Sequence, residues 1–121
     1  MAENLRPEGI PVTIGTVRIS TPGLTGRVEV KPMMVGDDML MVEFFQEAGV
    51  RIPQHVHADH ESIVYLLRGR MDLTVGEERF VAAAGDVWRH PVGVPHSSLA
   101  LEDCVAVEVK SPPRKTWNVG G

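Results

Sequence analysis

The sequence predicts an all-β domain, built either as a sandwich or as a barrel. Turn-forming Pro, Gly and Asp cluster along the whole chain, and the segments between the clusters are short and rich in β-branched residues. Several of these segments alternate apolar and polar side chains, which is the period of a strand with one buried face. No segment keeps an apolar stripe of helical period through three turns, so helices are not expected to build the core.

Each expected strand is an apolar or alternating run with turn residues at both ends. In chain order these runs are TIGTVRI at 13–19, RVEVKPMMV at 27–35, MLMVEFF at 39–45, SIVYLLR at 62–68, MDLTV at 71–75, RFVAA at 79–83, DVWRH at 86–90 and CVAVEV at 104–109. AGVRIP at 48–53 and PVGVP at 91–95 are interpreted as turns, and TVGEERF at 74–80 as a hairpin with its turn at Gly76.

Length and composition favour one domain over residues 1–121, large enough for a core without disulfides. The one cysteine, Cys104, lies in an apolar run and is expected to be buried. A formal charge of −4 without a basic cluster argues against nucleic acid and anionic membranes as partners. Residues 1–11 lack the pattern of a signal peptide, so a cytoplasmic location is expected; this segment is either loosely held or exchanged with a partner subunit.

Metal-ligand types crowd together in HVHADHE at 55–61. On a strand, His55 and His57 would point to the same side, because alternate residues share a face. Neutral imidazole binds Zn, Fe, Ni, Cu and Mn, and a nearby carboxylate adds charge that holds a divalent cation. The pair alone is weak evidence for a metal site, but GDVWRHPVGVPH at 85–96 adds a further histidine, His96, after a Pro/Gly turn.

These two stretches resemble the paired motifs of the cupins. The first, over 49–69, has Gly49, His55, His57, Glu61 and Gly69; the second, over 85–100, has Gly85, Pro91, Gly93 and His96, with Ala100 where the family has Asn. The resemblance implies a double-stranded β-helix, that is, a cupin jelly-roll barrel. It also implies one divalent transition metal (Ni, Zn, Fe or Mn) held by His55, His57, Glu61 and His96.

The first motif departs from the family by one extra residue. Counting forward from His57 puts the carboxylate ligand at Glu61, whereas counting back from Gly69 puts it at Ser62. Either a bulge turns Glu61 toward the metal, or three histidines and water complete the site. Asp59 and His60 are expected on a solvent-facing loop, and His90 either as a hydrogen-bonded core residue or beside the metal ligands.

The segment VEVKSPPRKTW at 107–117 is similar to the end of the small pectin-degradation cupins that linearise unsaturated monouronates. The resemblance implies catalytic roles for Glu108 and Arg114, with Glu where those proteins more often have Asp. Arginine binds carboxylates in a bidentate manner, and a carboxylate can move the proton during ring opening. A sugar acid or another small carboxylate is therefore the expected substrate.

Two other functions remain open at this point. One is a three-histidine Fe(II) dioxygenase acting on a small organic substrate, and the other is a cupin that binds a small ligand without catalysis. A homodimer is expected, because cupin-type sheets leave edge strands to cover. Met33, Met34, Met39 and Met41 are expected to line either the core, which is preferred, or the dimer interface. Trp88 and Tyr65 are first core candidates, with contact to a sugar ring as the alternative.

Overall fold

The computed structural model describes residues 17–18 and 24–112, and all of its regular secondary structure is β. The strands are β1 (Val17–Arg18), β2 (Val28–Val35), β3 (Leu40–Gln46), β4 (Arg51–His55), β5 (Glu61–Arg68), β6 (Arg70–Val75), β7 (Glu78–Ala83), β8 (Val87–His90), β9 (His96–Ala100) and β10 (Cys104–Ser111). Among the described residues, no helix is long and apolar enough to cross a membrane.

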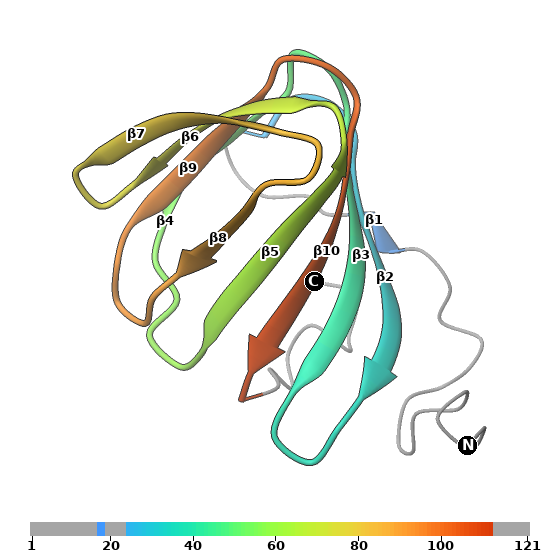
Figure 1. Ribbon diagram of the computed structural model, residues 1–121, viewed down its shortest axis with the longest axis vertical. Helices are drawn as coiled ribbons and strands as arrows, with labels where there is room; N and C mark the ends of the chain where they lie inside the picture. Colours follow the sequence, from blue (N-terminus) through green and yellow to red (C-terminus); the bar gives the residue numbers. More distant parts are fainter. Residues whose placement is uncertain (1–16, 19–23, 113–121) are drawn as a thin grey trace.

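The strands form two antiparallel sheets that fold over one another, as Figure 1 shows. One sheet has the order β1-β2-β3-β10-β5-β8, and the other has the order β4-β9-β6-β7. Strand β10, the last in the chain, lies between β3 and β5, so the chain crosses between the sheets and returns to the middle of the larger one. This topology confirms the predicted double-stranded β-helix.

The core lies between the sheets and follows from the strand alternation. In β5, Ser62, Val64 and Leu66 are buried, whereas Ile63 and Tyr65 between them are exposed. The main apolar cluster takes its residues from both sheets, namely Val64, Leu66, Met71, Leu73, Ala82, Ala100, Cys104 and Ala106. The prediction that Cys104 is buried is confirmed, since 0% of it is exposed. Burying one leucine side chain contributes about 1.5–3 kcal/mol, so this cluster is the main source of stability.

The connection between β5 and β6 is a single glycine, Gly69, with φ of +91°. A Cβ at this position would overlap the Asp103 carbonyl oxygen and approach the Cys104 sulfur to 2.9 Å. Both the backbone conformation and the lack of space therefore require glycine here. The loop before β10 packs directly on this turn, and the first of the two sequence motifs, over 49–69, ends here.

The hairpin predicted at 74–80 is confirmed, with β6 paired to β7 and Gly76 in the turn at φ of +60°. Two of the observed strands, β4 and β9, were not predicted from the sequence. Strand β4 begins inside the stretch that was interpreted as the turn 48–53, and β9 has the sequence HSSLA, which lacks β-branched residues. Propensity missed both strands because tertiary pairing, not local preference, makes them extended.

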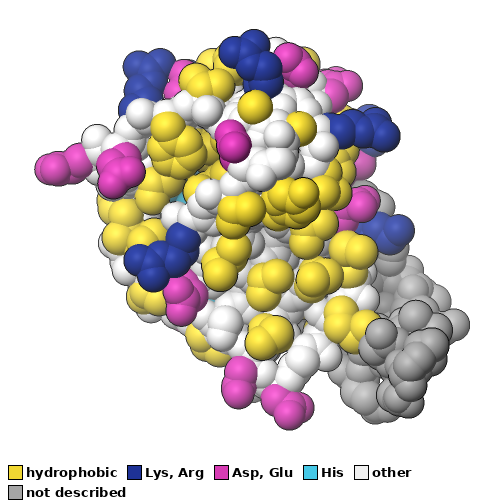
Figure 2. All heavy atoms as spheres, viewed as in Figure 1, with side chains coloured by type: hydrophobic (Ala, Val, Ile, Leu, Met, Phe, Trp, Pro, Cys, Tyr) yellow, Lys and Arg dark blue, Asp and Glu magenta, His cyan; other side chains and the backbone are white. Residues whose placement is uncertain are grey.

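The outer face of the larger sheet is apolar. Figure 2 shows hydrophobic side chains gathered over this face. The exposed apolar residues on the strands of the larger sheet include Met41, Ile63, Tyr65 and Leu67, which are 37%, 51%, 44% and 41% exposed. The expectation of a core position is wrong for Tyr65, Met33, Met39 and Met41, which are all exposed, whereas Met34 is partly buried. The homodimer stays a prediction.

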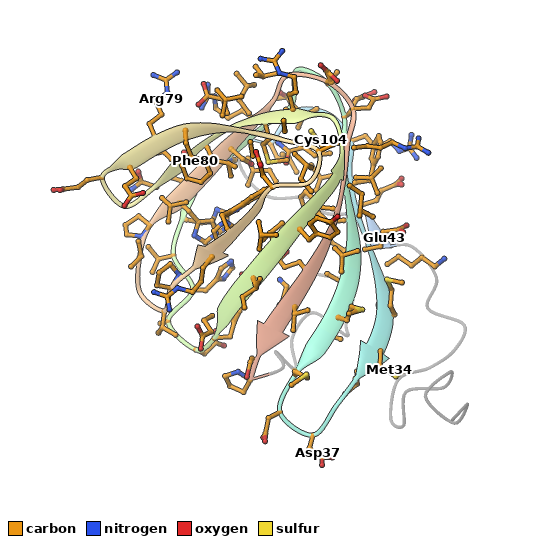
Figure 3. All side chains as sticks on the ribbon, in the orientation of Figure 1. Met34, Asp37, Glu43, Arg79, Phe80 and Cys104 are labelled. Atoms are coloured by element: carbon orange, nitrogen blue, oxygen red, sulfur yellow. The ribbon has the colours of Figure 1, made fainter. Side chains whose placement is uncertain are left out.

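Side chains alternate across the smaller sheet in the same way. In Figure 3, Arg79 points away from the barrel and the next residue, Phe80, points toward its interior. Phe80 packs against the apolar cluster together with Phe44 and Trp88. The core-facing prediction for Trp88 is thereby confirmed.

Candidate metal centre

Three histidines converge at one end of the barrel, between the two sheets. His55 is the last residue of β4 and lies opposite His96, the first residue of β9, in the antiparallel pairing of these strands. His57 follows β4 by two residues. One ring nitrogen from each of the three lies within 4.8 Å of the others, a spacing at which a single ion can contact all three.

The backbone of the second motif holds the first motif in place. The Gly93 N–H donates a hydrogen bond to the His57 carbonyl oxygen, at 2.9 Å. Gly93 has φ of +75°, which glycine adopts without strain, and this conformation belongs to the loop that leads into His96. The Pro/Gly turn at 91–95 thus fixes the loop after β4 as well as the start of β9.

Hydrogen bonds to the backbone orient two of the rings. His55 Nδ1 lies 2.8 Å from the Pro53 carbonyl oxygen, and His96 Nδ1 lies 3.3 Å from the Val94 carbonyl oxygen. Because a carbonyl only accepts, each Nδ1–H must donate, which leaves Nε2 as the lone-pair nitrogen in the neutral rings. Such bonds commonly orient metal-binding histidines.

Two of the three histidines, His57 and His96, are kept neutral by their surroundings. Burial, followed by the charges of His60 and His55, lowers the pKa of His57 to about 3. Burial, followed by the charges of His90 and His55, lowers the pKa of His96 to about 4. Neutral imidazole is the form that binds a transition metal, so this donor set fits a divalent ion.

Glu61 does not join this group. It is exposed at the start of β5, and its carboxylate lies 4.0 Å from Arg89 at the surface. Ser62, the other position that the motif spacing allowed, is 1% exposed and faces the interior. Within the described residues, the ligand group contains three histidines and no carboxylate.

The His60 side chain is buried in the barrel, although the residue belongs to the loop before β5. The expectation of a solvent-facing side chain is therefore wrong for His60 and right for Asp59. The His60 ring is 1% exposed and its centroid is 4.4 Å from that of His57, whereas Asp59 is 63% exposed and accepts a hydrogen bond from His60 Nδ1. The alternation of β5 could have revealed this, since Ser62 and Val64 share the inward face to which position 60 extrapolates.

The chain's remaining histidine, His90, also belongs to this end of the barrel. Its ring stacks on His96 with centroids 3.9 Å apart and planes 11° from parallel. The Trp88 indole N–H donates to His90 Nε2 at 3.0 Å, so the proton of neutral His90 sits on Nδ1, which lies 3.4 Å from the Ser62 hydroxyl. Burial lowers the pKa of His90 despite the opposing charge of Glu108. All five histidines therefore form one continuous group of rings.

Glu108 faces the same interior from β10. It lies opposite Val42 and Val64, both buried, so its side chain shares their inward face. Burial by itself would raise the pKa of Glu108, but the Lys110 and His90 charges and a hydrogen bond from Ser62 hold that pKa below its usual value. Glu108 is thus an ionised carboxylate at neutral pH, and the hydrogen bonds run from Trp88 through His90 and Ser62 to it. Arg114 lies outside the described residues.

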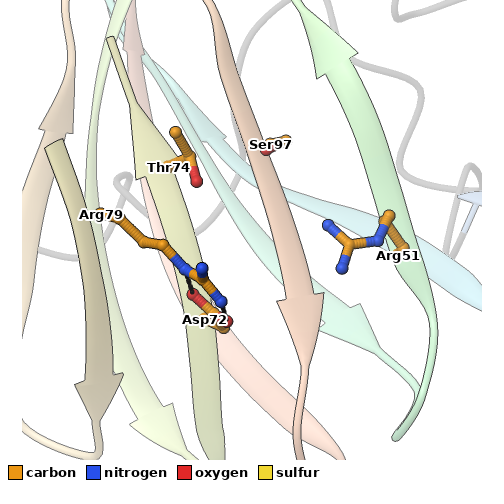
Figure 4. A pocket seen from close by; sticks show the side chains of 5 residues that line it. All are labelled: Arg51, Asp72, Thr74, Arg79 and Ser97. Carbon is orange, nitrogen blue, oxygen red and sulfur yellow. Dashed lines mark hydrogen bonds and ion pairs between the residues drawn. The ribbon is translucent and has the colours of Figure 1, made fainter. Parts of the chain in front are cut away.

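A hollow of about 210 Å³ lies on the outer face of the smaller sheet and is separate from the histidines. Figure 4 shows its lining of Arg51, Asp72, Thr74, Arg79 and Ser97. Arg79 forms an ion pair with Asp72 at 2.8 Å, which satisfies both charges at the surface. The lining contains no histidine, so this hollow is not the candidate metal centre.

Two antiparallel sheets with inward-facing histidines at one end define a β-barrel of the jelly-roll type with a candidate metal site. The sequence matches the family model described as "Cupin domain" over residues 41–109. The chain belongs to the cupin family.

Solved structures with similar folds include KdgF from Halomonas sp., with 24% identity, a TM-score of 0.73, and coverage of 84% of this chain and 89% of that one. A RmlC-like cupin from Shewanella frigidimarina is 18% identical, with a TM-score of 0.74, over 93% of this chain and 98% of that one. Among curated proteins, quercetin 2,3-dioxygenase from Bacillus subtilis is 39% identical over 49 residues, which is 40% of this chain but 14% of that protein.

Proposed function

We propose that this protein opens the ring of an unsaturated monouronate, in a reaction that needs a divalent metal. The observation that carries the proposal is the inward-facing carboxylate of Glu108 next to the three-histidine group. The resemblance of the segment 107–117 to the pectin-degradation cupins gives the substrate class. No net oxidation occurs in this reaction, which converts a cyclic hemiacetal into its open-chain isomer.

His55, His57 and His96 would hold the metal, and water or a substrate oxygen would complete its coordination. When bound, such an ion polarises a substrate oxygen and favours loss of a proton from a hydroxyl. The hydrogen bonds of His55 to Pro53 and of His96 to Val94 keep the rings oriented before the ion binds.

Glu108 is proposed to move the proton. Its carboxylate takes the proton from the anomeric hydroxyl, and the bond between the anomeric carbon and the ring oxygen breaks, giving an aldehyde. The electron pair of that bond stays on the ring oxygen, which becomes an enol oxygen next to the double bond. A proton then adds to the far carbon of the double bond, and the enol becomes a ketone. Atoms and electrons balance, because one proton leaves and one returns.

The test is the loss of ultraviolet absorbance of the ring double bond when the metal-loaded protein meets unsaturated monogalacturonate. Acceleration over buffer supports the proposal if His55→Ala abolishes both the metal content and the acceleration. Glu77→Gln, in the exposed turn between β6 and β7, is the matched control and is expected to behave as wild type. No acceleration with metal bound would exclude this activity on this substrate.

A second candidate is a three-histidine Fe(II) dioxygenase. The absence of a carboxylate from the ligand group, within the described residues, and the partial similarity to quercetin 2,3-dioxygenase favour it. O₂ uptake by the Fe(II)-loaded protein with an aromatic enol such as a flavonol, lost in His96→Ala, would support this candidate. If neither reaction occurs but small acids bind, the third alternative, a non-enzymatic ligand-binding cupin, is the better description.

A further inference from the structure

The inward face of β10 ends with a second charged residue, Lys110. It lies two residues after Glu108 and therefore on the same face of the strand. Its partners across the sheet are Leu40 on β3 and Ser62 on β5, which are 0% and 1% exposed and both face the interior. Lys110 itself is partly buried. The register thus directs a lysine into the barrel at the end where the histidines lie.

The positive charge of Lys110 acts on the groups of the site. After burial and the neighbouring histidines, Lys110 contributes to the lowered pKa of His57, and it also contributes to the lowered pKa values of His90 and Glu108. The three affected residues lie on different strands or loops, so the Lys110 charge must be close to the interior that they share. This agrees with the inward direction given by the register. The electrostatics and the geometry therefore point to the same position.

The Lys110 side chain forms no ion pair or hydrogen bond with another residue of the described ranges 17–18 and 24–112, although its charge acts on Glu108. Glu108, the nearest carboxylate along the strand, accepts its hydrogen bond from Ser62 instead. Buried charges in proteins are usually in direct contact with a partner of opposite charge. An incoming carboxylate would supply that direct contact.

We infer that the Lys110 ammonium binds the carboxylate of the small-molecule substrate inside the barrel and selects acids over their neutral esters. The inference deepens the proposed function and rests on it for the identity of the acid. Lysine is a compact point charge, and Glu108 adds a negative charge close by, so one carboxylate is favoured over a doubly charged phosphate. Arg114 was expected to take this role from the sequence alone, whereas the inference gives it to Lys110.

The test uses binding instead of turnover. Isothermal titration calorimetry of the protein, loaded with the metal that it retains on purification, compares galacturonate with its methyl ester. Galacturonate lacks the ring double bond, so its binding does not depend on the proposed reaction. Lys110→Met and Lys110→Gln are measured beside Lys31→Met, a matched change of an exposed lysine on β2, with metal content and thermal melting recorded for each.

The wild type is expected to prefer galacturonate over the ester, and both Lys110 variants to lose that preference by about ten- to a hundredfold. Lys31→Met keeps the preference, and Lys110→Arg recovers part of it, because the charge is restored. Three results would overturn the inference: no preference in the wild type, an unchanged preference in a folded, metal-containing Lys110 variant, or loss of preference in Arg114→Gln alone. Failure of ring opening with the binding pattern intact would overturn the proposed function and leave the lysine assignment standing.

Discussion

The two halves of strand β10 face different parts of the barrel interior. Cys104 and Ala106 are 0% and 1% exposed within the apolar cluster, whereas Glu108 and Lys110, on the same face, lie toward the histidines. Strand alternation places all four on one face, and the partners across the sheet are mainly apolar at both ends, with Phe44 and Leu66 beside Ala106 and Val42 and Val64 beside Glu108. The difference therefore lies in the side chains of β10 itself. Small uncharged side chains complete the apolar cluster at one end, whereas charged side chains at the other supply the groups proposed for binding and proton transfer.

This division predicts that substitutions at the histidine end alter activity with little effect on stability at neutral pH, and that substitutions at the apolar end do the reverse.

The largest effect is expected from Glu108→Gln, which removes the proposed proton acceptor but keeps the shape of the side chain. The ring-opening kcat/KM should fall about 10²- to 10⁴-fold, because general acid–base groups contribute about that much. Ultraviolet kinetics measure this, and metal analysis should show unchanged metal content. An unchanged rate with unsaturated monogalacturonate as substrate would assign the proton transfer to another group.

The counterpart at the apolar end is Leu66→Ala. Leu66 is 0% exposed, so the substitution leaves a cavity and is expected to lower the free energy of unfolding by about 2–5 kcal/mol. Urea denaturation measures the loss. Below the unfolding transition, metal affinity should stay close to that of the wild type. A folded Leu66→Ala protein that binds metal poorly would show that the two ends are coupled.

The last prediction is a pH dependence of the stability of the metal-free protein, which arises at the histidine end. In the unfolded chain, histidine has a pKa of about 6.5, whereas burial, followed by neighbouring histidine charges, lowers the pKa of His57 to about 3 and that of His96 to about 4. Between pH 6.5 and these values the unfolded state binds more protons, so stability should fall as the pH falls. Urea denaturation at pH 7, 5.5 and 4.5 measures the decline.

Asn in place of both histidines gives the control for this pH effect. The His57→Asn/His96→Asn protein should lose less stability between pH 7 and 4.5 than the wild type, because its side chains at these positions do not titrate. Parallel declines would assign the acid sensitivity to the carboxylates elsewhere in the chain.

The sequence predicted the fold and the outline of the site because short-range patterns carried both. Strand alternation, turn residues and the spacing of the two motifs located His55, His57 and His96, and these three come together in the structure. Strands β4 and β9, which carry two of them, were not recognised, since their short sequences RIPQH and HSSLA lack the alternation and the run of β-branched residues that mark a strand. Residues chosen for ligand chemistry weaken the local signal of the strands that hold them.

By itself, the sequence determined the all-β class, because strand alternation and turn residues are properties of the chain. Through their resemblance to the cupins, its two motifs also predicted the jelly-roll barrel and the histidines that gather. Only the tertiary structure decided which neighbours enter the site: Glu61 turns to the surface beside Arg89, whereas His60, Ser62 and Lys110 face the interior. The reason is register. A shift of one residue moves a side chain to the opposite face, and pairing with strands distant in sequence fixes that shift.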